Sequence, residues 1–156
     1  MNLKKNKIGV LGGSFDPAHK GHLTISKEAA KRFKLKKIIW AITKKNPFKK
    51  KSSQNLTARI SACKKIIKKI KFIEVKFYEN KIKSNKTINL INYLTKNKKN
   101  EIYFLMGADN LVSFHRWHKW KQISEKCNII VFDRYGYKKK SLNSKTYKTL
   151  KSEKFK

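Results

Sequence analysis

The sequence predicts an α/β fold, a Rossmann-like parallel sheet with helices on both of its faces. Short apolar segments typical of buried strands alternate along the chain with longer segments that have the spacing of amphipathic helices. Strands that alternate with helices are joined by right-handed crossovers, so they pair in parallel and the helices cover both faces. The segments that could hold a ligand each follow a predicted strand, and parallel sheets bind ligands at that edge.

The first half of the chain contains two predicted strands and two predicted helices. Lys7–Leu11 is a short apolar strand closed by two glycines, and Gly21–Phe33 has its apolar residues on one helical face. Lys37–Ile42 is a second buried strand. The lysine-rich segment Thr43–Asn55 contains a proline and is predicted as a loop. Leu56–Ile70 is the clearest helix, because its apolar residues form a single stripe.

The second half continues the alternation. Phe72–Phe77 is predicted as a strand, and a polar loop leads from it to Thr87, which is placed to cap the next helix. Glu101–Met106 is another strand, followed by a helix that contains two tryptophans, and Asn128–Phe132 is the last strand. From Tyr137 onward the chain has no clear period, so we expect a loosely ordered, basic polar tail.

Length and composition indicate one soluble, cytoplasmic domain. A chain of 156 residues can bury a proper core. Its apolar runs are too short to cross a membrane, and its N-terminal segment lacks the pattern of a signal peptide. The two cysteines, Cys63 and Cys127, have the spacing of neither a zinc site nor a disulfide framework. Cys63 falls on the apolar face of its helix, which predicts a buried free thiol.

The formal net charge of +32 leaves two explanations open. Strongly basic chains often bind nucleic acid. Here, however, only four of the basic residues are arginine, the usual residue for bidentate phosphate contacts, and the lysines are spread over the whole chain. Coding from an AT-rich genome would produce this composition. We therefore expect nucleic-acid binding to be at most non-specific, although the positive field would attract anionic substrates. The sequence does not indicate an oligomeric state.

The most informative segment covers residues 12–22, Gly-Gly-Ser-Phe-Asp-Pro-Ala-His-Lys-Gly-His, directly after the first predicted strand. Gly12 and Gly13 let the backbone approach a ligand closely. Amides at the start of the following helix can bind phosphate oxygens. His19 and His22 are three residues apart, so on one helical turn they face the same side. Two imidazoles directed at one point suit a transition state whose negative charge is spread over phosphoryl oxygens.

The pattern Gly-x-Phe-Asp-Pro-x-His-x-Gly-His resembles the signature of nucleotidyltransferases with a His-x-Gly-His motif, which transfer a nucleotidyl group from a nucleoside triphosphate and release pyrophosphate. Within that superfamily the chain is similar to the bacterial nicotinate-nucleotide adenylyltransferases, although Tyr135 stands where that family commonly has proline. The resemblance covers roughly residues 7–137, so we expect a nucleotidyltransferase domain over 1–137 and a tail over 138–156. The segments that carry the narrower resemblance are Asn46–Lys49, Thr87–Leu90, Met106–Leu111, Phe114–Trp120 and Ile130–Gly136.

The resemblance implies adenylyl transfer from ATP to nicotinate mononucleotide, which yields nicotinate adenine dinucleotide and pyrophosphate in NAD biosynthesis. Mg²⁺ would accompany the triphosphate, and no side chain is predicted as a metal ligand. His19 and His22 would contact the ATP phosphates and stabilise the α-phosphate under attack. Asp109 would contact the ribose or a metal-bound water, or else cap a helix. The full set expected to bind ATP is Gly12, Gly13, Ser14, Phe15, Gly107 and Asp109.

The expected acceptor site consists of Lys49, Thr87, Trp117 and Arg134. Trp117 would stack on the pyridine ring, although a place in the core is the alternative for it, as for Trp120. Amides beside Thr87 could receive the nicotinate carboxylate, or Thr87 only caps its helix. Lys49 and Arg134 are candidate phosphate contacts. A further arginine, on the predicted helix 56–70, matches a family arginine or else forms a local ion pair.

One element of the family is absent from this sequence. A Ser-Ser/Thr-x-x-Arg segment near the C-terminus grips the ATP phosphates in the family, and no such segment occurs here. We therefore expect a truncated form, and weak triphosphate binding if these 156 residues are the complete protein. Two other functions stay open: a related adenylyltransferase that uses nicotinamide mononucleotide or phosphopantetheine as acceptor, and an inactive remnant that binds nucleotide or RNA.

Overall fold

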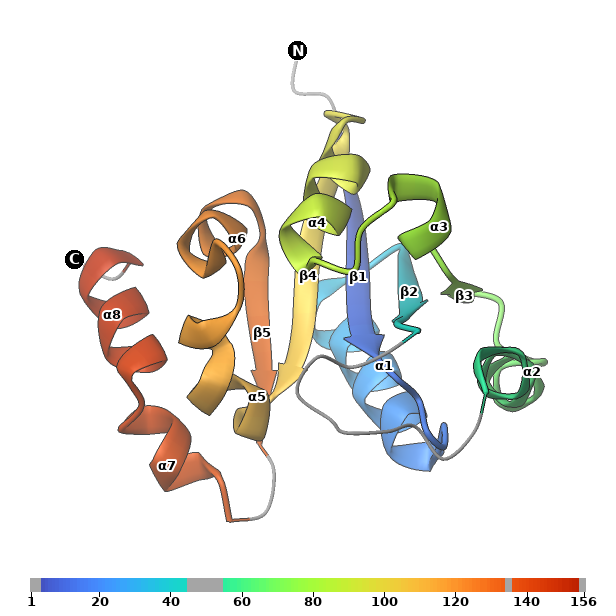
Figure 1. The fold of residues 1–156 in the computed structure, drawn as a ribbon, viewed down its shortest axis with the longest axis horizontal. Coiled ribbons are helices and arrows are strands. Elements are labelled where there is room, and N and C mark those ends of the chain that lie inside the picture. Colours follow the sequence, from blue (N-terminus) through green and yellow to red (C-terminus); the bar gives the residue numbers. More distant parts are fainter. Residues whose placement is uncertain (1–3, 45–54, 134–135, 155–156) are drawn as a thin grey trace.

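A computed structural model describes residues 4–44, 55–133 and 136–154, and its centre is a five-stranded sheet with helices on both faces (Figure 1). The strands lie in the order β3-β2-β1-β4-β5 and every neighbouring pair is parallel, so the predicted α/β fold is confirmed. The order reverses between β1 and β4, where open sheets leave a crevice for ligands. The strands are β1 (Asn6–Gly13), β2 (Lys37–Ile42), β3 (Ile73–Lys76), β4 (Asn100–Gly107) and β5 (Asn128–Phe132).

Alternate residues of the strands pack into two apolar clusters, one on each face of the sheet. Val10 and Phe104 belong to the cluster under α4 and α6, and Leu11 and Leu105 belong to the cluster under α1 and α2. Because side chains alternate across a strand, these apolar runs bury both faces of the central strands. The helical elements are α1 (Lys20–Phe33), α2 (Leu56–Ile66), α3 (Glu79–Ile82), α4 (Thr87–Thr95), α5 (Ala108–Ser113), the 3-10 turn η1 (Phe114–Arg116), α6 (Trp120–Lys126), α7 (Lys138–Leu142) and α8 (Lys145–Lys154).

Several predicted boundaries need correction. The first strand continues through both glycines to Gly13, because these residues pair with Ala41 and Ile42 of β2. The helix predicted over 56–70 ends at Ile66, and the following turn leads into β3 while Ile67 and Ile70 still pack on the core. The loop after β3 contains the short helix α3, which was not predicted.

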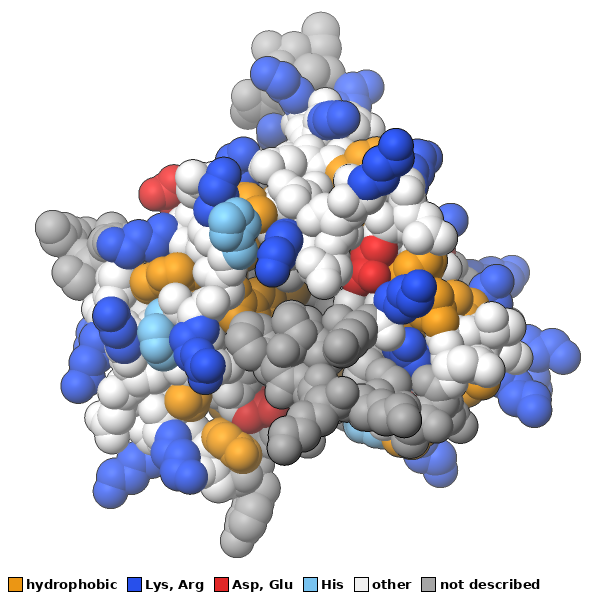
Figure 2. Space-filling model, in the orientation of Figure 1, with side chains coloured by type: hydrophobic (Ala, Val, Ile, Leu, Met, Phe, Trp, Pro, Cys, Tyr) orange, Lys and Arg blue, Asp and Glu red, His pale blue; other side chains and the backbone are white. Residues whose placement is uncertain are grey.

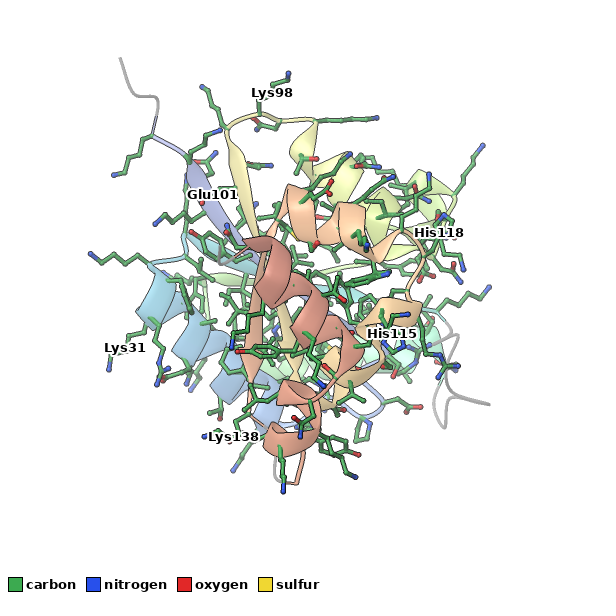
Figure 3. The ribbon with its side chains drawn as sticks, turned by 90° about the vertical axis from the view of Figure 1, so that its left-hand side faces the viewer. Lys31, Lys98, Glu101, His115, His118 and Lys138 are labelled. Carbon is green, nitrogen blue, oxygen red and sulfur yellow. The ribbon has the colours of Figure 1, made fainter. Side chains whose placement is uncertain are left out.

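The segment after Tyr137 is not loosely ordered as predicted. Residues 138–154 form α7 and α8, which lie along the β5 side of the molecule and pack against α5 (Figure 1). Their packing surface combines Leu150 and Tyr147 with small polar residues: Thr146 is fully buried, and Ser141 and Ser144 are nearly so. The Thr146 hydroxyl accepts a hydrogen bond from the His115 N–H at 3.0 Å, and Figure 3 shows His115 beside α8. Apolar periodicity did not reveal these helices, because hydroxyl-bearing residues form much of the contact.

The molecular surface agrees with the composition. Lysine and arginine side chains are spread over the described part of the face seen in Figure 2 rather than gathered on one element. None of the described helices is long and apolar enough to cross a membrane. Cys63 is a buried free thiol, which confirms its prediction, and Cys127 is buried with its thiol donating to the Ile123 carbonyl at 3.1 Å.

Candidate active site

The chain turns sharply after β1, and this turn is the first part of the site. Ser14 and Phe15 are buried, and Phe15 has a φ of 50°, in the left-handed region that aromatic residues rarely occupy. A side chain added at Gly12 would meet only the Phe104 ring, at 3.6 Å, and one added at Gly13 would meet the Phe15 ring at the same distance. These are ordinary contacts, so packing does not require glycine at either position. Both glycines instead line an open pocket, where a side chain would occupy space for a ligand.

The two histidines form the N-terminus of α1. His19 is the N-cap, and its Nδ1 accepts a hydrogen bond from the Gly21 N–H at 3.0 Å. The Nδ1 of His22 accepts one from the His19 N–H at 3.1 Å, which completes a reciprocal capping box. Because each Nδ1 acts as an acceptor, the ring proton of each neutral imidazole lies on Nε2. The ring centroids are 4.0 Å apart, so the two rings lie together, as predicted.

The ring of His22 packs on buried aromatic rings. Phe15 lies 4.6 Å from the His22 ring and stacks on Trp40 at 5.1 Å, centroid to centroid. The Trp40 Nε1–H donates to the Ser26 hydroxyl, which in turn donates to the His22 carbonyl, both at 2.8 Å. Ser14 and Phe15 were predicted to bind ATP; both are buried, and the Phe15 side chain belongs to this stack. For Phe15, the backbone is therefore the part that can face a ligand.

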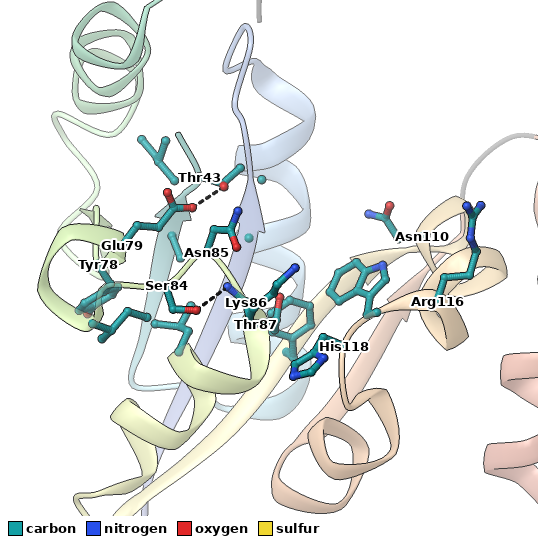
Figure 4. Close-up of a pocket in the computed structure, with 18 of the residues that line it drawn as sticks. Thr43, Tyr78, Glu79, Ser84, Asn85, Lys86, Thr87, Asn110, Arg116 and His118 are labelled. Carbon is teal, nitrogen blue, oxygen red and sulfur yellow. Dashed lines mark hydrogen bonds between the residues drawn. The ribbon is translucent and has the colours of Figure 1, made fainter. Parts of the chain in front are cut away.

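A pocket of about 630 Å³ opens at the carboxyl ends of β1, β2 and β4 (Figure 4). Gly12, Gly13, Thr87 and Trp117 all line it, so the structure brings these four predicted residues together. Trp117 packs edge-on against Phe104 and Phe114, with centroids 5.9 and 5.1 Å away, and it also faces the pocket. Trp120 also packs on Phe114 but is not among the lining residues.

Two predicted details at the pocket are wrong. Thr87 is the first residue of α4 rather than its N-cap; that position belongs to Lys86, and no described side chain caps the helix there. Trp117 and Trp120 do not share a helix, because Trp117 lies between η1 and α6. The Ser84 hydroxyl accepts from the Lys86 N–H at 3.0 Å just before α4, but no described side chain caps the first amides of the helix itself. This N-terminus borders the pocket at Lys86 and Thr87, which suits an anionic ligand.

Gly107 and Asp109 lie where β4 meets α5. Gly107 is the N-cap residue of α5 and Asp109 lies in its first turn, so the capping alternative for Asp109 is wrong. A Cβ at Gly107 would come within 2.5 Å of Asp109 Oδ1, so the Asp109 carboxylate would have to move if another residue stood there. Neither residue lines the pocket, and neither do His19 and His22. Lys49 and Arg134 lie outside the described residues.

The sequence interpretation missed several pocket residues. Arg116 and His118 flank Trp117, and Lys86 precedes Thr87, so three basic side chains approach the pocket (Figure 4). The positive charges of Arg116 and Lys86 attract anionic substrates. All three basic residues are adjacent in sequence to a predicted site residue, and this adjacency could have identified them. Glu79, by contrast, lies in a segment read as a plain loop. The additional lining residues with polar side chains are Thr43, Tyr78, Glu79, Ser84, Asn85, Lys86, Asn110, Ser113, Arg116 and His118.

The buried thiol of Cys63, on α2, should make the stability of the protein depend on pH. Burial raises the pKa of its thiol to about 11, although the nearby Arg59 acts in the opposite direction. The unfolded thiol titrates near 8.5, so above that pH the unfolded chain holds fewer protons than the folded one. We therefore expect the free energy of unfolding to fall as pH rises from about 8.5 to about 11. Denaturant titrations over this range should show a shallower fall for Cys63→Ala, and an identical slope would contradict the prediction.

Comparison with known proteins gives related results from sequence and from structure. A family model described as cytidylyltransferase-like matches residues 10–155. A "Probable nicotinate-nucleotide adenylyltransferase" of Pelagibacter ubique is 67% identical over 147 residues, which cover 94% of this chain and 82% of the relative. A protein with the same name from Agrobacterium fabrum is 39% identical over 131 residues, 83% of this chain and 70% of the relative.

Solved structures share the fold. The nicotinic acid mononucleotide adenylyltransferase of Plasmodium falciparum, complexed with NaAD, superposes with a TM-score of 0.74 at 20% identity, covering 85% of this chain and 67% of that one. The same enzyme complexed with APC has a TM-score of 0.74 at 19% identity, covering 85% and 66%. At this level of identity the likeness supports the architecture of the sheet and its helices.

Proposed function

Because this chain belongs to the nicotinate-nucleotide adenylyltransferases, within the cytidylyltransferase-like family, we propose that the pocket and the adjoining turn together bind its substrates, ATP and nicotinate mononucleotide. The enzyme transfers the adenylyl group of ATP to the mononucleotide and produces nicotinate adenine dinucleotide and pyrophosphate, a step of NAD biosynthesis. The observation that supports the placement is the meeting of Gly12, Gly13, Thr87 and Trp117 in one pocket. The cytoplasmic location expected from the sequence is part of this proposal, since ATP is supplied there.

The histidines act on the phosphates in this proposal. A phosphate oxygen of the mononucleotide attacks the α-phosphorus of ATP, and the bond to the β-phosphate oxygen breaks. The nucleophile is already anionic at neutral pH, so the reaction needs alignment and charge stabilisation rather than a strong base. The Nε2–H groups of His19 and His22 would donate to the α-phosphate as its charge develops. Backbone amides after Gly13 would hold the remaining phosphate oxygens.

The acceptor base would occupy the pocket beside Trp117. Its pyridine ring is flat and cationic, so it gains from stacking on the indole. The α4 N-terminus beside Thr87 would receive the nicotinate carboxylate, while Arg116 and Lys86 add positive charge. Lys49 and Arg134 remain candidate contacts to phosphate. Asp109 would contact the ribose or a metal-bound water.

A magnesium ion fits this site as part of the nucleotide. Among the described residues there is no group of three or more histidine, cysteine or acidic side chains that could hold a metal. Mg²⁺ commonly binds through substrate phosphates with one or two carboxylates and several waters, and Asp109 would contact the ribose or one of those waters. When bound, the ion would neutralise part of the triphosphate charge.

The proposal is tested with the purified protein, ATP, Mg²⁺ and three acceptors in parallel, by measuring pyrophosphate release and identifying the dinucleotide. We expect kcat/KM for nicotinate mononucleotide to exceed that for nicotinamide mononucleotide about tenfold, because only the acid can make charge-assisted bonds at α4. Phosphopantetheine should give no product, and excess EDTA should stop the reaction. Equal use of both mononucleotides would contradict the assigned carboxylate site. A folded protein without turnover on any acceptor would favour the binding remnant.

A further inference from the structure

Arg59 is a charged side chain that α2 carries into the protein interior, where it is 1% exposed. Its Nη1 donates hydrogen bonds to the carbonyls of Ser14 at 2.8 Å and Thr43 at 2.7 Å, and its Nη2 donates to the carbonyl of Lys44 at 2.7 Å. Ser14 follows β1, and the other two residues follow β2. A well-packed apolar side chain would avoid the desolvation cost of the guanidinium. The buried charge therefore indicates a geometric requirement at the ends of these two strands.

One consequence concerns the turn after β1. A trans peptide is planar, and its C=O and N–H point in opposite directions. Because the Ser14 carbonyl is directed inward at Arg59, the Phe15 N–H of the same peptide points away from it. The strained φ of Phe15 persists only where the surroundings hold it. Arg59 supplies part of that support, and a hydrogen bond of 2.9 Å from the Thr43 N–H to the Gly13 carbonyl supplies more.

Glu79 binds the other side of a peptide group that Arg59 also binds. The Thr43–Lys44 peptide accepts from Arg59 at its carbonyl, and its N–H donates to Glu79 Oε2 at 3.1 Å. The Thr43 hydroxyl donates to Glu79 Oε1, a bond drawn in Figure 4. A cation at the carbonyl and a carboxylate at the N–H both stabilise one orientation of this peptide dipole. Glu79 begins α3 and lines the pocket, so the contacts run unbroken from the phosphate turn to the pocket wall.

We propose that Arg59 and Glu79 are positioning residues that hold the turn after β1 and the α3 wall of the pocket in one fixed arrangement. The inference rests on the proposed function, in which the turn binds the triphosphate and the pocket binds the acceptor. In-line attack requires the two substrates to be aligned, and small misplacements cost much of the rate. Loss of either residue should therefore lower kcat more than it raises either KM.

The kinetic test uses substitutions that keep size or charge. Arg59→Lys keeps the charge but loses the planar fork that reaches three carbonyls. Glu79→Gln keeps the size but loses the carboxylate. We expect each to lower kcat on the order of tenfold, with little change in KM for either substrate. The double variant should lose less than the product of the single losses, because both act on one peptide. The exposed pair on α1 offers matched controls, Arg32→Lys and Glu28→Gln, which should leave kcat unchanged.

A second measurement needs no turnover. Amide hydrogen exchange of the substrate-free protein should show faster exchange at Lys44 in Glu79→Gln, and unchanged exchange there in Glu28→Gln. If Arg59→Lys does not fold, Glu79→Gln decides the matter by itself. Wild-type kcat in Glu79→Gln, or unaltered exchange at Lys44, would overturn the positioning role. A wild-type protein without turnover would instead contradict the proposed function, and the exchange result would still test the network.

Discussion

Replacing His22 by glutamine should lower kcat by about 10²- to 10³-fold, the loss typical when one hydrogen-bond donor to a developing oxyanion is removed. The structure separates this loss from any loss of folding. His22 occupies the N3 position of the α1 capping box, where glutamine is itself a favourable residue. His22→Gln can therefore keep the bond to the His19 N–H while the imidazole and its Nε2–H are lost. Because the glutamine amide is itself a donor, His22→Ala is measured beside it as the variant with no side-chain donor. Steady-state kinetics and a thermal melt of the same preparation check both parts of the expectation.

The control for His22 is a change on the same helix that spares the imidazoles. Lys27 is exposed on α1, and Lys27→Ala should leave both kcat and the melting temperature close to those of the wild type. His19→Ala should combine the kinetic loss with the cost of a missing N-cap, about 1 kcal/mol. Retained activity in both His22→Gln and His22→Ala would refute the role assigned to the histidine pair.

Replacing Trp117 by leucine should lower kcat/KM for nicotinate mononucleotide roughly 10- to 100-fold, since stacking of a base on an aromatic side chain contributes about 1–3 kcal/mol. Leucine keeps apolar contacts with Phe104 and Phe114, so the core beneath the pocket should persist. The effect should fall on KM for the mononucleotide, whereas KM for ATP should change little. Initial rates measured over a grid of both substrate concentrations separate the two.

Trp120 is the matched control for Trp117. Both tryptophans pack on Phe114, at 5.1 Å for Trp117 and 6.0 Å for Trp120, but only Trp117 lines the pocket. Trp120→Leu should therefore reduce stability without changing KM for the mononucleotide. Equal changes of KM in the two variants would mean that Trp117 acts through packing and not through contact with the base.

Much of the fold was predictable because its signals are local. The strand Lys37–Ile42 is observed with the predicted bounds, and α1 begins one residue before the predicted helix. Continuous apolar runs and a 3.6-residue period report directly on burial, and both are read within a short window. The helices α7 and α8 gave no such signal, since Ser141, Ser144 and Thr146 fill the positions that apolar residues usually hold. Their burial depends on contact with α5 and η1, far away along the chain.

The site was predictable where a motif carries its own geometry. The spacing of His19 and His22 implied that the rings lie together, and their centroids are 4.0 Å apart. No comparable signal marks Phe15. It lies in a turn of the sequence, but in the folded protein its ring stacks on Trp40. Its role as a support for His22 follows from a contact between residues twenty-five positions apart, which sequence patterns do not report.

By itself, the sequence determined the class of fold, the order of the five strands along the chain and the proximity of His19 and His22, because each depends on neighbours within a few positions. Only the tertiary structure decided which tryptophan faces the pocket and which side chains of the turn are interior. It also decided that Arg59 joins the ends of β1 and β2, where the sequence left an ion pair and a family role open. The physical reason is that a side chain's surroundings are set by long-range packing of the strands and helices, which no short segment encodes.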